Sequence, residues 1–240
     1  MLRLLQSHIS QTQVLRFKLL YTLIFVFICS TVSASSLFVG DEPVPPAVSI
    51  VESQTNVLLS ELSNRKEEFT EEPGKLVHFA KTIALKHWDI TKASRLILGP
   101  HWRNASAEER QQFEDEFLRT LLRYVVRAYG YYDDDLIKVV EYDWQETRRG
   151  GWVLSKVKIP GGVKVNVDYR MTYNSKSKQW NLIDVRVEGI SLVVVKKREF
   201  REIVTRDGFS DLIAFMANKN NEILKGIEGY SNGQQITGSE

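Results

Sequence analysis

Few side chains in this 240-residue sequence have the types and spacing that chemistry requires. Three of its four histidines, His78, His87 and His101, lie beyond the N-terminal segment, and no two of them have the i,i+4 spacing of a helical metal site. The sequence also lacks the HExxH, P-loop, GxGxxG and GxSxG motifs. We therefore expect no metal centre, no nucleotide site and no serine-hydrolase site.

Carboxylates are the remaining candidates for chemistry. The acidic residues 133–135 lack the spacing of a calcium-binding loop, so we interpret them as a solvated turn. Asp168 and Asp184 alternate with apolar residues, so their side chains should project from the face of a sheet opposite to the apolar side chains. Asp184 and Arg186 should face outward. Asp168, Asp184 or Tyr169 could carry out proton transfer on a small hydrophobic substrate.

The first 34 residues have the features of an export signal. Residues 19–28 form a ten-residue apolar stretch, which follows Arg3, Arg16 and Lys18 and precedes small residues with a cleavage site after Ala34. No acidic residue occurs before Asp41. The stretch has the length of a signal-peptide core and is short for a bilayer span, although a membrane anchor is the alternative.

Removal of this signal changes what the charge and cysteine content imply. The whole chain has 32 basic and 30 acidic residues, and the signal takes away three basic ones, so the net charge falls from +2 to −1. Bulk charge then gives no argument for nucleic-acid binding. The single cysteine, Cys29, leaves with the signal, so the mature chain has no thiol for a disulfide or a metal. Export without cysteines fits a bacterial periplasm.

Helical patterns fill the first half and the end of the mature chain. Residues 35–46 contain three prolines and predict an extended leader. Helices are predicted over 47–65, after Pro73, over 89–99, and most strongly from Ser106 to about 129, where Ser106 and Glu109 have the spacing of a capping box. Two more are predicted over 197–206 and 210–225, followed by a flexible tail at 227–240.

Strand patterns occupy the region between these helices. They cover residues 137–144, 151–159, 163–173 and 179–187, and the last continues into the apolar run 190–195. Short turns join them, which predicts a curved antiparallel sheet with one face covered. The predicted fold class is α+β: a helical N-terminal half, an antiparallel sheet and C-terminal helices, in one domain over residues 47–226.

Two stretches of the chain resemble a known family. "LILGPHWRNASAEERQQFEDEFLRTLLRYVVRAY" (residues 96–129) is similar to an LG-x-x-W-R-x-A-S-x-E-x-R-x-x-F pattern. "VNVDYRMTYNSKSKQWNLIDVRVEGISLV" (residues 165–193) is similar to a V-D-Y-R … W-x-x-x-D-V-x-x-E-G-x-S-L-V pattern. Both patterns belong to the MlaC or toluene-tolerance family of periplasmic phospholipid carriers. The chain departs from it at Lys197, where many members carry arginine, which leaves partner details open.

The resemblance implies a fold related to the nuclear-transport-factor-2-like shape, with sheet and helices enclosing an apolar cavity. It implies a carrier without catalytic residues or cofactor, whose cargo is phospholipid. Such a carrier shuttles lipid between an outer-membrane lipoprotein–porin complex and an inner-membrane ABC-type lipid transporter complex, and so maintains outer-membrane lipid asymmetry. We expect a monomer that binds no nucleic acid.

A lipid carrier needs a large, dry pocket, because each acyl CH₂ group exposed to water costs about 0.8 kcal/mol. Apolar side chains on the long helix and on one face of the sheet are the candidate lining, and each of them also fits an ordinary core position. The candidates are Phe117, Leu121, Leu122, Val125, Val165, Val167, Tyr169, Met171, Ile183, Val185 and Val187. Two other functions stay open: an enzyme using carboxylate acid/base chemistry, and an adaptor whose interior is filled by its own side chains.

Overall fold

The structure is a computed structural model that describes residues 45–130, 138–158, 162–225 and 227. The expected signal peptide, the leader up to residue 44, the acidic residues 133–135 and residues 228–240 of the expected tail lie outside the described residues. Ile227, which we placed at the start of the tail, is buried against the C-terminal helices.

Helices make up the N-terminal half, as predicted. The capping box is confirmed: Ser106 Oγ accepts a hydrogen bond from the Glu109 N–H (3.1 Å), and the Glu109 carboxylate accepts one from the Ser106 N–H (2.7 Å). Asp89 is the N-cap of the helix that begins at Ile90, because its carboxylate accepts a hydrogen bond from the Lys92 N–H. The elements are α2 (Pro46–Asn64), α3 (Lys66–Glu71), α4 (Pro73–Phe79), the π-helical turn η1 (Ala80–Ala84), α5 (Ile90–Leu98), α6 (Pro100–Asn104) and α7 (Ala107–Tyr129). The sequence pattern did not indicate the short helices α3 and α6.

The predicted antiparallel meander is also present. Its strands lie in the order β1-β2-β3-β4-β5, each antiparallel to the next, and two helices follow. These elements are β1 (Lys138–Thr147), β2 (Gly150–Lys158), β3 (Lys164–Asn174), β4 (Gln179–Val187), β5 (Ile190–Ser191), α8 (Leu192–Arg206) and α9 (Phe209–Leu224). The fold class is therefore α+β, as the sequence indicates.

The apolar run after Gly189 is not the continued strand that its composition predicts. Only Ile190 and Ser191 pair with β4, and α8 begins at Leu192. Ser191 is the N-cap of this helix, because its hydroxyl accepts a hydrogen bond from the Val194 N–H at 3.0 Å. The helix turns Val194 and Val195 toward solvent, where they are 56% and 45% exposed. Valine-rich composition favours a strand, but here the N-cap hydrogen bond of Ser191 favours the start of a helix.

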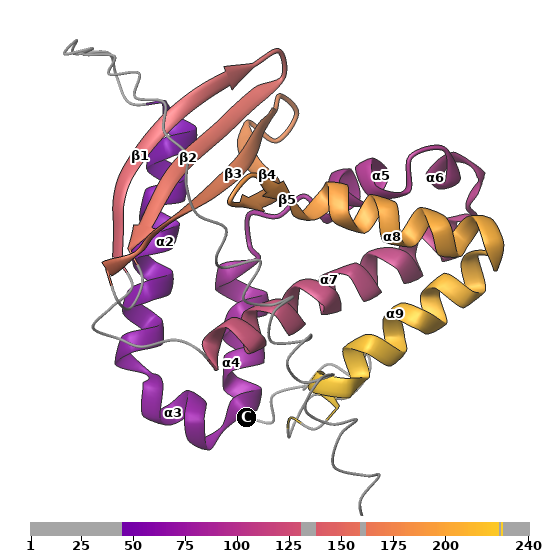
Figure 1. The fold of residues 1–240 in the computed structure, drawn as a ribbon, viewed down its shortest axis with the longest axis horizontal. Coiled ribbons are helices and arrows are strands. Elements are labelled where there is room, and N and C mark those ends of the chain that lie inside the picture. Colours follow the sequence, from indigo (N-terminus) through magenta and orange to yellow (C-terminus); the bar gives the residue numbers. More distant parts are fainter. Residues whose placement is uncertain (1–44, 131–137, 159–161, 226, 228–240) are drawn as a thin grey trace, which may run out of the picture.

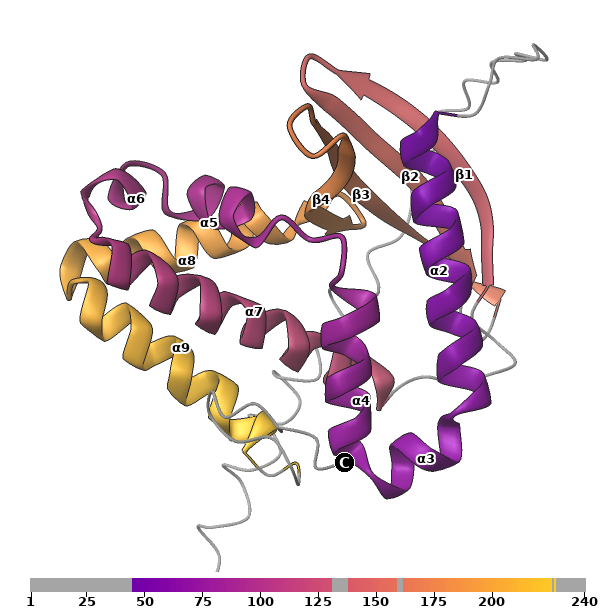
Figure 2. The same cartoon turned by 180° about the vertical axis from the view of Figure 1, so that it is seen from behind.

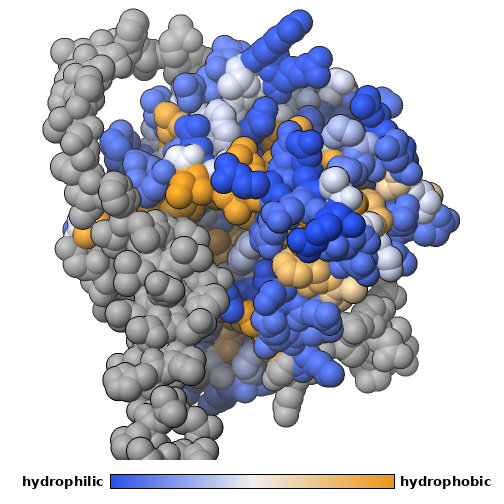
Figure 3. Space-filling view, turned by 45° about the vertical axis from the view of Figure 1, so that its right-hand side comes forward, coloured by the Kyte–Doolittle hydropathy of each residue, from blue (hydrophilic) through white to orange (hydrophobic). Residues whose placement is uncertain are grey.

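The elements form two packed groups (Figures 1 and 2). Helix α2 lies along one face of the sheet, whereas α5, α7, α8 and α9 pack on one another beside the β4–β5 end. The apolar core is divided into three clusters: one in the helical group, one between α2 and the sheet, and a smaller one where α2, α3 and α4 meet. Trp88 contacts the first two. Figure 3 shows hydrophobic surface across the middle of one side of the molecule, bordered by hydrophilic residues. The apolar interior is thus not closed into a single core.

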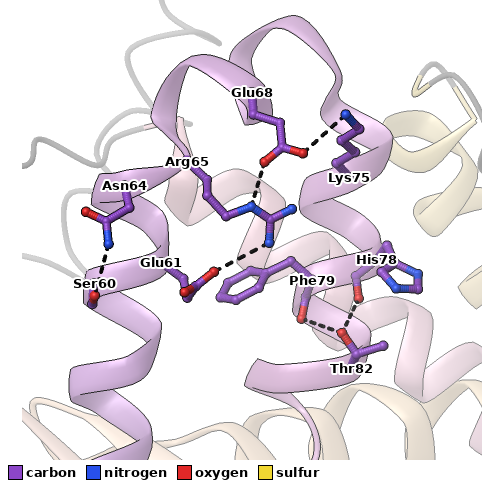
Figure 4. A network of polar contacts seen from close by, with 9 residues as sticks. All are labelled: Ser60, Glu61, Asn64, Arg65, Glu68, Lys75, His78, Phe79 and Thr82. Carbon is purple, nitrogen blue, oxygen red and sulfur yellow. Dashed lines mark hydrogen bonds and ion pairs between the residues drawn. The ribbon is translucent and has the colours of Figure 1, made fainter.

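Arg65 holds the corner where α2 turns through α3 into α4 (Figure 4). Its guanidinium lies 2.6 Å from Glu68 Oε2 and 3.5 Å from Glu61 Oε2, and it stacks over the Phe69 ring at 4.5 Å. Lys75 of α4 approaches the same Glu68 carboxylate at 3.2 Å. The two cations, Arg65 foremost, lower the pKa of Glu68 to about 2. Ion pairs therefore link all three helices at this corner.

We expect Glu68→Gln to lower the melting temperature only slightly at pH 7, by about 1–3 °C, because ion pairs this exposed contribute little. The folded pKa of Glu68 is depressed, so its contribution is complete above the usual glutamate value of 4.5 and declines as the pH falls toward 2. Melting curves of the variant and the wild type at pH 7 and pH 3 check this, and the difference should shrink at pH 3. Glu67→Gln is the matched control on α3. An equal difference at both pH values would contradict the assignment.

Candidate apolar binding site

One face of the sheet is apolar and lies toward α2. Val167 pairs with Val187, and Tyr169 pairs with Val185, so these four side chains lie opposite one another on the same face. The two-residue period of β3 adds Val165 and Met171 to it. Six of the seven sheet residues that we predicted as lining therefore share this face: Val165, Val167, Tyr169, Met171, Val185 and Val187.

Ile183, the seventh, lies at a β-bulge. The register of β4 against β3 shifts here, and Met171 pairs with Leu182 rather than with Ile183. Leu182 consequently joins the cluster under α2, whereas Ile183 is buried without belonging to that cluster. Strand alternation could not predict this exchange, because a bulge shifts the side-chain period by one residue.

The residues before α5 contact β4 at the β-bulge. His87 and Asp89 bind the free edge of β4: the Leu182 N–H donates to the His87 carbonyl (2.8 Å) and the Asp89 N–H donates to the Leu182 carbonyl (2.9 Å). Trp88, between them, contacts both apolar clusters. The β-bulge at Leu182 and Ile183 therefore lies where the sheet contacts the helical group.

The predicted lining residues on α7 lie in the helical group. Phe117, Leu121 and Leu122 are fully buried in its cluster, and the Phe117 ring stacks on Phe113 with centroids 6.2 Å apart. Helix α7 packs mainly on α9 and α5. Val125 is only partly buried at the edge of the cluster. The structure therefore brings Val125, and not the other three, to a surface that is still accessible.

The apolar face of the sheet combines accessible surface with a desolvated environment. Val167, Tyr169, Val185 and Val187 are all only partly buried, whereas Met171, under α2, is fully buried. Burial nonetheless raises the pKa of Tyr169 to about 12, so protein surrounds this phenol although part of its surface stays accessible. Tyr169 is therefore a partly accessible side chain in a largely desolvated environment.

Tyr142 also belongs to this face, Thr55 of α2 contacts it, and the sequence-based interpretation missed both. Tyr142 of β1 packs against the cluster under α2. Thr55 lies on the inward side of α2, where it interrupts the apolar spacing of Val48, Val51 and Leu58. A polar residue within an otherwise apolar helical stripe is the signal that could have identified this position.

The opposite face of the sheet carries the two aspartates that we considered for acid/base chemistry. They lie on the predicted face, but the expectation that Asp184 faces outward is wrong, since Asp168 and Asp184 are 6% and 2% exposed. Asp168 Oδ2 is 2.5 Å from Arg186 Nε, and the Arg186 guanidinium lies 4.2 Å from the centroid of the Trp152 ring. Arg186 itself is partly buried by these contacts. Asp168 is therefore held in a buried ion pair.

Asp184 joins β4 to the start of α8. Its carboxylate accepts hydrogen bonds from the Ser191 hydroxyl (2.5 Å) and from the Val193 N–H (3.0 Å). Burial raises the pKa of Asp184. Tyr169 lies on the other face of the sheet, so the structure does not bring it together with Asp168 and Asp184. These three residues therefore form no common acid/base site.

Residues of the two resembling stretches have identifiable roles in the fold. Arg95 and Arg110 lie over the Trp102 ring, 5.7 and 5.5 Å from its centroid, and Arg110 Nε donates to the Trp102 carbonyl at 2.9 Å. Gly189, with φ of +77°, turns the chain from β4 into β5. Within the described ranges, no group of three His, Cys, Asp or Glu residues could hold a metal ion, and no helix is long and apolar enough to cross a membrane.

The fold and the site define a class: α+β proteins in which a curved antiparallel meander and its helices pack around a divided apolar core, with a partly accessible apolar face on the sheet. The family model described as MlaC protein matches residues 52–218, and the chain belongs to this family. The resemblance seen in the two stretches is therefore confirmed.

Known proteins similar to this chain support the same assignment. The toluene tolerance protein ttg2D of Pseudomonas putida is 24% identical over 189 residues, which cover 78% of this chain and 86% of that protein. A phospholipid-binding protein from Ralstonia solanacearum, solved in complex with a phospholipid, matches with a TM-score of 0.63 and 19% identity. The match covers 73% of this chain and 97% of that structure. The second comparison shows that the fold is shared.

Proposed function

We propose that this protein is a periplasmic phospholipid carrier that binds acyl chains between the apolar face of the sheet and the helices, and acts as a monomer. The observation that carries this proposal is the partly accessible apolar face around Tyr169, within a desolvated interior. Membership of the MlaC family and the phospholipid bound by the similar Ralstonia protein support it.

The physical argument concerns the cost of exposing acyl chains to water. Each CH₂ group that leaves water gains about 0.8 kcal/mol, so a carrier must cover most of both chains of a diacyl lipid. In our proposal Val167, Val185 and Val187 contact the chains, and Val125 faces them from α7. Phe117, Leu121, Leu122, Val165, Met171 and Ile183 are fully buried by protein, so in this proposal they form the packed surroundings of the site and do not contact the chains.

We further propose that the carrier moves lipid between an outer-membrane lipoprotein–porin complex and an inner-membrane ABC-type transporter. A lipid bound over most of its length leaves slowly, so release requires a partner that favours an open state of the carrier. The separation of the apolar cluster in the helical group from the cluster between α2 and the sheet supports such an opening, because the two groups of elements can separate without exposing one continuous core.

Lipid analysis of the mature protein, purified from a Gram-negative periplasm without detergent, tests this function. We expect native mass spectrometry to show about one phospholipid per chain and organic extraction to recover it. Delipidated protein should take up phospholipid from vesicles. A folded protein that carries no lipid and takes none up from vesicles would overturn the proposal in favour of an interior filled by its own side chains.

A further inference from the structure

The apolar face of the sheet contains a group of hydroxyls that no apolar cargo chain can satisfy. Tyr142 of β1 pairs with Ser155 of β2, and Val153 of β2 pairs with Tyr169 of β3. Because paired residues share a face, Tyr142 and Tyr169 lie diagonally across β2 on the side toward α2. Ser155, between them, already donates its hydroxyl proton to the Val167 carbonyl. The phenol of Tyr169 contacts Thr55 and Ser155, which leaves the phenol of Tyr142 to be considered.

The phenol of Tyr142 is buried without a hydrogen-bond partner among the described residues. Burying a hydroxyl with no partner is unfavourable, and most buried polar groups in proteins have one. Thr55 of α2 interacts with both phenols and offsets part of the rise in pKa that burial causes in each. This contact falls short of hydrogen-bond geometry at Tyr142. Its O–H therefore remains available to an acceptor that is not part of the described chain.

The charges around the two phenols restrict what that acceptor can be. Burial is the main cause of the raised pKa of both phenols, Glu52 adds to it at Tyr142 and Asp168 adds to it at Tyr169, and no cation is among the causes. A phosphate or a free carboxylate would therefore find no counter-charge at these phenols, and its burial there would be unfavourable. Both phenols also stay protonated at neutral pH and can only donate through O–H. A neutral carbonyl oxygen on an otherwise apolar molecule satisfies all of these conditions.

We infer that Tyr142 and Tyr169, supported by Thr55, form a polar anchor inside the apolar site that donates hydrogen bonds to an ester carbonyl of a bound acyl lipid. This inference rests on the proposed function and deepens it, because it names the part of the lipid that the protein recognises. Acyl chains offer no direction-specific contact, whereas a carbonyl bound at one place fixes how deeply the lipid enters. The carrier would then distinguish ester-linked lipids from ether-linked lipids with the same chains and head group.

Competition between two matched lipids tests the anchor. Delipidated full-length mature protein is mixed with vesicles that contain equal amounts of a diester phosphatidylglycerol and its diether analogue, and the bound lipids are quantified by mass spectrometry. We expect the wild type to prefer the diester by about three- to tenfold, the range of one to two neutral hydrogen bonds. The Tyr142→Phe, Tyr169→Phe double variant should bind both lipids equally. Tyr173→Phe, at an exposed tyrosine of β3, the strand that contains Tyr169, is the control and should keep the preference.

The outcomes separate this inference from the proposed function. Equal binding of both lipids by the wild type would overturn the anchor and leave the carrier intact. The same preference in wild type and double variant would also overturn it. A double variant that binds both lipids more tightly than the wild type, by the same factor, would overturn it as well, because that result indicates that water hydrates the phenols. If the wild type binds neither lipid, the proposed function itself fails. Each single Tyr→Phe variant provides a milder change should the double variant fold poorly.

Discussion

Val167→Arg is expected to abolish phospholipid retention in a protein that still folds. Val167 lies in the middle of the apolar face of β3, opposite Val187, and is only partly buried, so the larger side chain has room. A guanidinium in contact with acyl chains would have no counter-ion, and an unpaired charge in an apolar site costs several kcal/mol. The variant can avoid this cost by admitting water, which excludes the lipid.

Native mass spectrometry of the purified variant measures this effect, and thermal unfolding verifies the fold. Val194→Arg is the matched control, because it introduces the same charge at a valine that is 56% exposed on α8. Val167→Trp tests the site without charge: the added volume should displace lipid while the face stays apolar. A folded Val167→Arg protein with its full complement of lipid would remove Val167 from the site. Equal loss in Val194→Arg would show that charge alone, and not position, matters.

Local signals predicted most of the fold. The Ser106–Glu109 capping box and the alternation in β3 depend on residues close in sequence, and both predictions are confirmed. The start of α8 was misplaced because its first turn contains three consecutive valines, which are typical of strands. Ser191 caps that helix, but a serine within a short apolar run also fits a strand, so only the tertiary contact with Asp184 distinguishes the two.

The site was less predictable, because it depends on pairing between distant segments. The four-residue spacing of Phe113, Phe117 and Leu121 identifies a buried stripe but does not say whether protein or cargo covers it. In the structure other helices cover it. The proximity of Tyr142 to Tyr169 follows from the register of β1 against β2 and of β2 against β3, and a sequence without its register does not contain that information.

The second large effect is expected at Asp184. Asp184→Ala should lower the free energy of unfolding by about 3 kcal/mol, because it leaves the Ser191 hydroxyl and the Val193 N–H without their acceptor in a buried position. Asp184→Asn retains one acceptor oxygen and should cost about 1 kcal/mol, with lipid binding largely intact, since the residue lies on the face opposite to the site. Urea denaturation monitored by tryptophan fluorescence provides both values.

The pH dependence of this loss distinguishes a buried carboxylate from a merely well-packed side chain. Burial raises the folded pKa of Asp184 above its usual value of 3.8, so the folded state holds the proton to a higher pH than the unfolded chain does. The contribution of this group to stability therefore decreases as the pH rises from the usual pKa of 3.8 through the raised folded pKa. The difference in the free energy of unfolding between wild type and Asp184→Asn should be larger at pH 4 than at pH 7. Glu146→Gln, at an exposed carboxylate of β1, is the control and should show no such trend. A loss below about 1 kcal/mol in Asp184→Ala would mean that Ser191 alone suffices to begin α8, and that the link between sheet and helices lies in the packing of Trp88 instead.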